Sequence, residues 1–131
     1  MPSCYDALGF RMIARAGFPA AFLSGYSVSA AHLGEPDFGF LTQSEMADAA
    51  RDVARVSTAP VIVDADTGYG NALNVRRTVR EFERAGVAAF HLEDQVFPKR
   101  CGHYDDKAVV PPAEMVQKLR AARDAAQDPD L

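Results

Sequence analysis

Acidic side chains recur at the ends of two apolar segments. Asp64 and Asp66 close APVIVDAD, and Glu93 follows the apolar residues of AAFHLED. Carboxylates two residues apart on a strand point the same way and repel each other unless a proton or a cation separates them. A hard divalent ion such as Mg2+ prefers these oxygen ligands. The pattern predicts a metal site formed by Asp64, Asp66 and Glu93; helix-capping aspartates in a solvated loop are the alternative.

A cysteine lies in a charged segment shortly after these acids. In PKRCGHYDDK, Lys99 and Arg100 precede Cys101, and His103 follows it. Neighbouring cations favour the thiolate form, so Cys101 is a candidate for nucleophilic attack or for proton transfer. A zinc site would need more soft ligands than Cys101 and His103, and Cys4 is the only other thiol. An inert loop cysteine is the remaining alternative.

The segments that position these side chains alternate between strand and helix patterns. Strands are predicted at 20–25, 59–66 and 88–94. Four helices are predicted, the first at 10–16 and the second after a capping-box pair at Thr42 and Glu45. The third contains the apolar positions 75, 79 and 82 and stops at Gly86, and the fourth begins at Pro112. On the last helix, Met115, Leu119 and Ala122 are expected to form the apolar stripe. The alternation implies an α/β fold whose parallel strands are buried on both faces.

Two architectures fit this order, an open doubly wound sheet and a (β/α)8 barrel. In both, functional sites lie at the carboxyl edge of the sheet, where Ser24-Gly25, Asp64-Ala65-Asp66 and Glu93-Asp94 fall. A dinucleotide-binding sheet needs a glycine-rich turn that accepts phosphates, but acids precede the glycines of 66–70 and repel phosphates. The barrel is therefore favoured.

Composition narrows the class of protein. The chain has 131 residues, of which 48% are hydrophobic and 24% charged, with a formal net charge of -4. This suits a globular domain and argues against nucleic-acid binding, which usually requires a basic face. No apolar run approaches the roughly 20 residues that cross a bilayer, and the first residues lack a secretory pattern. We expect a cytoplasmic protein with reduced cysteines and no membrane partner.

Together these motifs resemble the isocitrate lyase and phosphoenolpyruvate mutase superfamily. PKRCGH resembles the Lys-[Lys/Arg]-Cys-Gly-His signature of isocitrate lyases, and the likeness extends over 61–86, 91–103 and the segment SGYSVSAAHLGEPDFGFLT. It covers essentially the whole chain and points to the short-chain lyases, such as 2-methylisocitrate lyase and 2,3-dimethylmalate lyase. The resemblance implies a (β/α)8 barrel that requires Mg2+, with Mn2+ as a substitute, and that acts on a small carboxylate substrate.

The resemblance also implies roles for individual residues. The metal-site acids of the family fall on Asp64, Asp66 and Glu93. Its cradle for a substrate carboxylate falls on Ser24, Gly25 and Tyr26, and an aspartate lining the site falls on Asp37, which is otherwise an ordinary turn residue. Its gating loop falls on Lys99, Cys101, Gly102 and His103. In the lyases of the family the loop cysteine acts as a general acid.

The implied reaction is the cleavage of a carbon–carbon bond. A 2-hydroxy di- or tricarboxylate similar to 2-methylisocitrate would give a 2-oxo acid and a second carboxylate. A branch of carboxyphosphonoenolpyruvate mutases carries the same cysteine signature, so phosphonate chemistry of the phosphoenolpyruvate mutase type is the alternative activity.

The length is short for this architecture. A complete barrel needs about 250 residues, and residues 1–131 contain about four βα units. We expect a partial barrel domain over 1–131, incomplete at both ends, that is either part of a lyase or an inactive fragment needing a partner half. For the full-length family the resemblance implies a homo-oligomer, commonly a tetramer.

Overall fold

Four short parallel strands form one sheet in the order in which they occur along the chain. The computed structural model describes residues 1–131. The strands are β1 (Ser3–Cys4), β2 (Ala21–Leu23), β3 (Val61–Asp64) and β4 (Ala89–His91). The register places Leu23 beside Val63 and Asp64 beside His91. All four carboxyl ends therefore lie at the same edge of the sheet.

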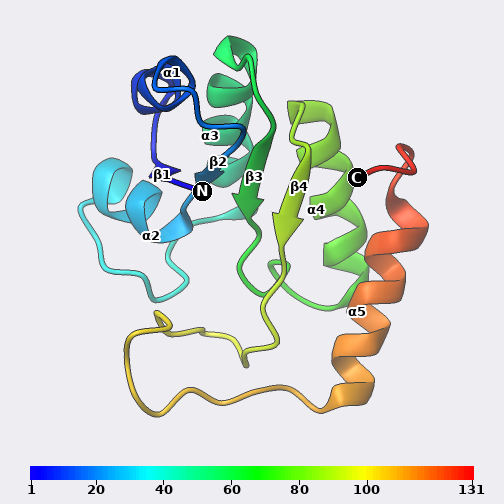
Figure 1. The fold of residues 1–131 in the computed structure, drawn as a ribbon. Helices are drawn as coiled ribbons and strands as arrows, with labels where there is room; N and C mark the ends of the chain where they lie inside the picture. The colour runs from blue at the N-terminus through cyan, green and yellow to red at the C-terminus, as the bar shows by residue number, and fades with distance from the viewer.

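Helices cover one face of this sheet (Figure 1). They are α1 (Ala7–Arg15), α3 (Gln43–Val56), α4 (Ala72–Ala85) and α5 (Pro112–Ala125), with a short α2 (Gly25–Val28) and a π-helical turn η1 (Ser29–Leu33) after β2. The long segment between β4 and α5 passes across the carboxyl edge before α5 packs beside α4. This arrangement confirms the predicted α/β class with a parallel sheet. The long helices that follow the strands all lie on the same face of the sheet.

Local sequence signals explain several helix ends. The predicted capping box of α3 is present: the Thr42 amide donates to Glu45 Oε2 at 2.7 Å, and the Glu45 amide donates to Thr42 Oγ1 at 3.3 Å. Gly86 ends α4 with φ 88°, a left-handed angle that glycine adopts without steric cost. Helix α1 begins earlier than predicted, because Asp6 accepts a hydrogen bond from the Gly9 amide at 2.7 Å. Helix α2 and turn η1 lie in a segment for which no helix was predicted.

The core lies between the sheet and its helices. Leu23 and Val63 on the helix-covered face are fully buried with Met46 and Phe82, whereas Phe22 and Ile62 on the other face are only half-buried. The prediction of two buried faces is therefore wrong for this structure, because no segment of the chain covers the second face. None of the helices has the length and apolar character needed to cross a membrane.

The face of α5 that packs on the protein differs from the predicted stripe. Ala122 is buried as expected, but Leu119 is 50% exposed and Met115 is only half-buried. Lys118 takes a buried position instead, with 4% of its surface exposed. The apolar periodicity was too short and too weak to set the rotation of this helix.

Candidate active site

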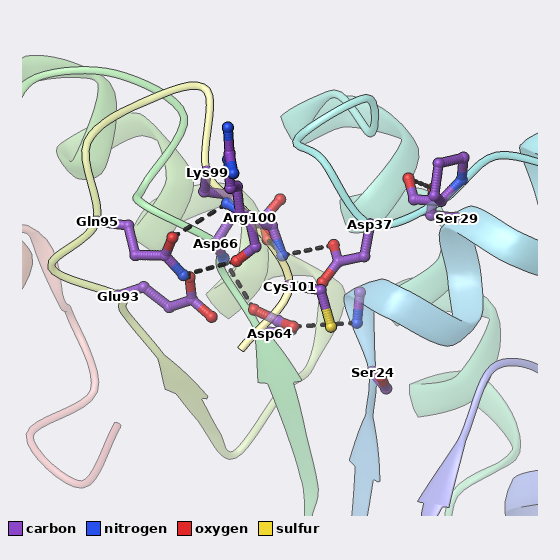
Figure 2. Close-up of polar contacts among 12 residues, drawn as sticks. Ser24, Ser29, Asp37, Asp64, Asp66, Glu93, Gln95, Lys99, Arg100 and Cys101 are labelled. Atoms are coloured by element: carbon purple, nitrogen blue, oxygen red, sulfur yellow. Dashed lines mark hydrogen bonds and ion pairs between the residues drawn. The ribbon is translucent and has the colours of Figure 1, made fainter. Parts of the chain in front are cut away.

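Polar side chains gather above the carboxyl ends of β2, β3 and β4 (Figure 2). Asp64 is the last residue of β3, and its Oδ2 accepts a hydrogen bond from the Gly25 amide at 3.2 Å. A Cβ atom at Gly25 would lie 2.9 Å from Asp64 Oδ2. Glycine at position 25 therefore lets the end of β2 approach this carboxylate closely.

Asp66 reaches the site by a route that the sequence did not predict. Strand β3 ends at Asp64, so the expected strand alternation that would align Asp64 and Asp66 is wrong. The chain instead turns through left-handed angles, with φ 46° at Asp66 and φ 61° at Tyr69. The Asp66 amide donates to Asp64 Oδ1 at 3.0 Å, which holds the two acids next to each other.

Lys99 joins two of the acids. Its side chain is only 1% exposed, and its Nζ lies 2.8 Å from Asp66 Oδ1 and 2.5 Å from Asp37 Oδ1. Asp37 follows turn η1 and is itself buried. Figure 2 shows Asp37, Asp66 and Lys99 together above the strand ends. The Lys99 ammonium group thus supplies a counter-charge to Asp37 and to one of the three predicted metal-site acids, Asp66.

Burial sets the ionisation of this cluster. Burial raises the pKa of Asp66 to about 6; Lys99 opposes this effect and Asp64 adds to it. Burial also disfavours the charged form of Lys99, but Asp66 and Asp37 outweigh it and raise the pKa of Lys99 above its usual value. At neutral pH Asp66 is therefore ionised and Lys99 protonated, and the two form a buried ion pair.

Glu93 is connected to the loop through Gln95, a residue that no sequence motif indicated. Gln95 Nε2 donates to Glu93 Oε2 at 2.8 Å and to the Arg100 carbonyl at 2.9 Å. Gln95 Oε1 in turn accepts from the Arg100 amide at 3.0 Å. Burial raises the pKa of Glu93, with Lys99 opposing the shift. One buried amide side chain thus links a site carboxylate to the backbone between Lys99 and Cys101.

Cys101 is buried beneath the loop that carries it. Its Sγ lies 3.4 Å from His103 Nδ1, while His103 and Gly102 are exposed. Lys107 Nζ donates to the Gly102 carbonyl at 3.0 Å and also to the Tyr104 carbonyl. Because the Lys99 ammonium points to Asp37 and Asp66, the imidazole is the side chain that contacts the thiol.

The residues matched to a carboxylate cradle form the start of α2. Ser24 Oγ accepts a hydrogen bond from the Ser27 amide at 3.4 Å, and the Gly25 amide is engaged by Asp64. Tyr26 is 55% exposed. The structure brings Gly25 to the acids and leaves Tyr26 on the surface.

The donor set fits a hard cation, although the acids do not converge on one point. No group of three or more His, Cys, Asp or Glu side chains is arranged to hold a metal ion. The available donors, Asp64, Asp66 and Glu93, are all carboxylates, and Asp66 Oδ1 lacks a hydrogen bond apart from its ion-pair contact with Lys99. Oxygen ligands of this kind suit Mg2+ or Mn2+ rather than a thiolate-seeking ion.

Two further residues of the site carried no sequence signal. Tyr69 is partly buried, and burial together with Asp66 raises its pKa well above its usual value, so its phenol stays neutral beside the acids. Lys118 donates to the Thr67 carbonyl at 2.9 Å. A buried lysine on a helix with a weak apolar stripe cannot be distinguished from an exposed one by spacing alone.

A parallel sheet with its helices on one face and an acid-lined site at its carboxyl edge defines an α/β protein of the (β/α) barrel type. Residues 1–131 match the family described as phosphoenolpyruvate phosphomutase. The chain therefore belongs to this family, within the phosphoenolpyruvate mutase and isocitrate lyase superfamily.

Relatives in this family carry both lyase and mutase names. The chain is 51% identical to 2,3-dimethylmalate lyase of Eubacterium barkeri, over 99% of this chain and 45% of the relative. It is 53% identical to the chloroplastic carboxyvinyl-carboxyphosphonate phosphorylmutase of Arabidopsis thaliana, over 100% of this chain and 39% of the relative. It is 49% identical to 2-methylisocitrate lyase of Aeropyrum pernix, over 97% of this chain and 41% of the relative. The chain thus spans less than half the length of these relatives.

Solved structures agree with the fold. The phosphoenolpyruvate phosphomutase of Streptomyces platensis subsp. rosaceus superimposes with a TM-score of 0.95 at 39% identity, covering 98% of this chain and 45% of that chain. A phosphonopyruvate hydrolase in complex with oxalate and Mg++ superimposes with a TM-score of 0.89 at 34% identity, covering 98% of this chain and 44% of that chain. These neighbours are barrel-type enzymes, which confirms the predicted fold class.

Replacing Lys99 with methionine is expected to release the loop that buries Cys101. The change leaves Asp37 and Asp66 without their counter-charge and removes the contact that anchors the loop. Labelling of Cys101 by a thiol reagent should accelerate about tenfold or more, which corresponds to about 1.4 kcal/mol of lost anchoring.

Stopped-flow absorbance would follow this labelling, and Cys101→Ser would identify the signal. Arg100→Met is the matched control, because Arg100 is exposed and precedes the same cysteine. Equal labelling rates for Lys99→Met and the unaltered chain would show that Lys99 does not hold the loop.

Proposed function

We propose that this chain carries the metal- and carboxylate-binding site of a Mg2+-dependent carbon–carbon lyase. The substrate class is a small 2-hydroxy di- or tricarboxylate similar to 2-methylisocitrate. The observation that carries the proposal is the placement of the Cys-Gly-His loop over buried acids at the strand ends, with Cys101 itself buried there. The lyase names of relatives at about half identity support it.

The acids and the loop have separate tasks in this reaction. Asp64, Asp66 and Glu93 would hold the cation directly or through water, and the cation would polarise the hydroxyl and carboxylate of the substrate. Asp66 is buried and Asp64 and Glu93 are partly buried, so their charges act on the substrate in a region of reduced dielectric constant. Lys99 offsets part of their negative charge, which reduces the repulsion of an anionic substrate.

The proton balance assigns a role to the thiol. The substrate hydroxyl loses its proton, its oxygen forms the new carbonyl, and the adjacent carbon–carbon bond breaks. The electron pair of that bond passes to the departing carboxylate fragment as an enolate-like carbanion. A carboxylate with a raised pKa, as at Glu93, is suited to accept the hydroxyl proton. Cys101 would donate a proton to the carbanion, with His103 at 3.4 Å to exchange protons with the sulfur.

Phosphonate chemistry is the second candidate. The carboxyvinyl-carboxyphosphonate phosphorylmutase relative is 53% identical over the whole chain, which is as similar as the lyase relatives. Assays with 2-hydroxy acids and with phosphonates in parallel would separate the two, because only a lyase releases a 2-oxo acid from the former.

Mg2+ added together with oxalate is expected to raise the melting temperature of the chain. Oxalate resembles the planar enolate of a 2-oxo acid and chelates a divalent ion. A ligand that binds only the folded state at about 100 times its dissociation constant adds about 2.7 kcal/mol, or roughly 8 °C for a domain of this size. Calorimetry with and without Mg2+ and oxalate measures the shift.

Asp64→Asn should abolish this shift, whereas Asp94→Asn, at an exposed acid after the same sheet edge, should retain it. A cooperative melt with no shift would contradict the metal site. The absence of a cooperative melt would mean that the site does not form in this chain by itself.

Metal affinity is expected to fall as the pH drops through about 6. A metal binds the carboxylate and not the carboxylic acid, and burial places the pKa of Asp66 at about 6. Above this pH the affinity should be level; below it, one competing proton weakens binding by about tenfold per pH unit.

The dissociation constant of Mn2+, measured by electron paramagnetic resonance between about pH 5 and about pH 8, tests this slope. Asp66→Asn removes the titrating group and should give weaker binding with a flatter profile. If the Mn2+ affinity of the unaltered chain stayed constant down to about pH 5, Asp66 would be excluded as the titrating ligand.

Cys101→Ser is expected to lower turnover on the cleaved 2-hydroxy acid by at least about a hundredfold, the usual contribution of a positioned general acid. Substrate binding should change little, because serine keeps the shape of the side chain. Steady-state kinetics measure both quantities, with Cys4→Ser as the control at the other free cysteine. Full turnover in Cys101→Ser would rule out the proton-donor role.

A further inference from the structure

The turn that carries Asp66 has its carbonyl groups bound by three different elements. The Asp66 carbonyl accepts from the Glu93 amide at 2.7 Å, just beyond β4. The Thr67 carbonyl accepts from Lys118 Nζ of α5 at 2.9 Å. The Gly68 carbonyl accepts from Thr78 Oγ1 of α4 at 3.2 Å. Three consecutive peptide groups are thus fixed from outside the turn.

This turn needs outside support because its backbone is strained. Asp66 and Tyr69 both adopt φ values that side chains other than glycine disfavour, at 46° and 61°. Residues held in such regions cost of order 1–3 kcal/mol each and persist only where the surroundings determine them. The position of the Asp66 carboxylate therefore depends on the groups that bind the turn.

Among these groups, Lys118 is the least expected. Its side chain is 4% exposed, between α5 and α4, and it takes part in none of the ion pairs of the chain. Burying an ammonium group against a neutral carbonyl gains little stability, and an apolar residue would pack there at lower cost. The contribution of Lys118 is instead the hydrogen bond that its ammonium group donates to the turn that carries Asp66.

We propose that Lys118 is a positioning residue that holds the Asp66 turn in its left-handed geometry and thereby sets the affinity of the site for a divalent cation. Helix α5 follows directly on the Cys101 loop in the chain. One helix would then both end the loop and fix the acid beneath it. The second part of this inference rests on the proposed metal site, whereas the first does not.

Hydrogen exchange tests the first part without any metal. Lys118→Met keeps the length of the side chain and removes the donor. The Gly68 amide, bonded to the Ala65 carbonyl at 2.8 Å, and the Glu93 amide should exchange about tenfold faster or more. The amides of Val79 and Phe82 within α4 should be unchanged. Gln117→Met, at the exposed neighbouring position, is the matched control.

Mn2+ affinity tests the second part. Changing a group that orients a ligand typically weakens metal binding by about 10–100-fold, and we expect this loss in Lys118→Met and not in Gln117→Met. Lys118→Arg, which keeps a donor, should restore both the exchange rates and the affinity. Electron paramagnetic resonance of free Mn2+ gives the dissociation constants.

The outcomes separate the two proposals. Unchanged Gly68 exchange in Lys118→Met, or faster exchange at every amide alike, overturns the positioning role. Faster local exchange in a chain that binds no Mn2+ even when unaltered would support the positioning of the turn and reject the metal site. Faster local exchange with unweakened Mn2+ binding would show that the turn does not govern metal affinity.

Discussion

The constraint on which this site depends is the burial of negative charge at one edge of a sheet. Asp37 and Asp66 are both almost fully buried, and burial alone would keep Asp66 protonated at a higher pH than an exposed aspartate. Lys99 meets this constraint, and in doing so it fixes the loop on which Cys101 lies. The contacts that neutralise the acids are therefore the same contacts that position the loop. A divalent cation at the same acids would share their charge with Lys99, so the loop and the cation cannot be independent of each other.

The acids reach this edge by unrelated backbone routes. Asp64 ends a strand, whereas Asp66 needs a left-handed turn and Asp37 arrives on a loop after η1. Each route is stabilised by a group from elsewhere, such as the Gly25 amide for Asp64 and the Gln95 amide group for Glu93. The site is consequently only as rigid as the packing between elements. A change on α4 or α5 can alter it without touching any acid.

The two faces of the sheet differ in a way that bears on the site. Leu23 and Val63 are sealed by helices, while Phe22 and Ile62 on the opposite face stay half-exposed. By strand alternation Ile62 shares its face with Asp64, so the acid edge and the half-buried apolar surface are continuous. Any segment that covers Phe22 and Ile62 would also exclude water from beneath Asp64 and strengthen its electrostatic interactions.

The sequence by itself determined the alternation of strands β2, β3 and β4 with helices α1, α3, α4 and α5. It also determined the capping box at Thr42, the stop at Gly86 and the placement of acids at strand ends, because these depend on short spacings and local backbone preferences. Its motifs also identified the family. It did not determine the route of Asp66, since strand alternation was assumed two residues beyond the end of β3. Nor did it show that Lys99 points at Asp37 and Asp66 rather than at Cys101, or that Lys118 is buried while Leu119 is exposed. Those facts depend on which surfaces meet when β3, α5 and the 98–107 loop pack together, and contacts between residues far apart in the sequence leave no periodic trace in the chain.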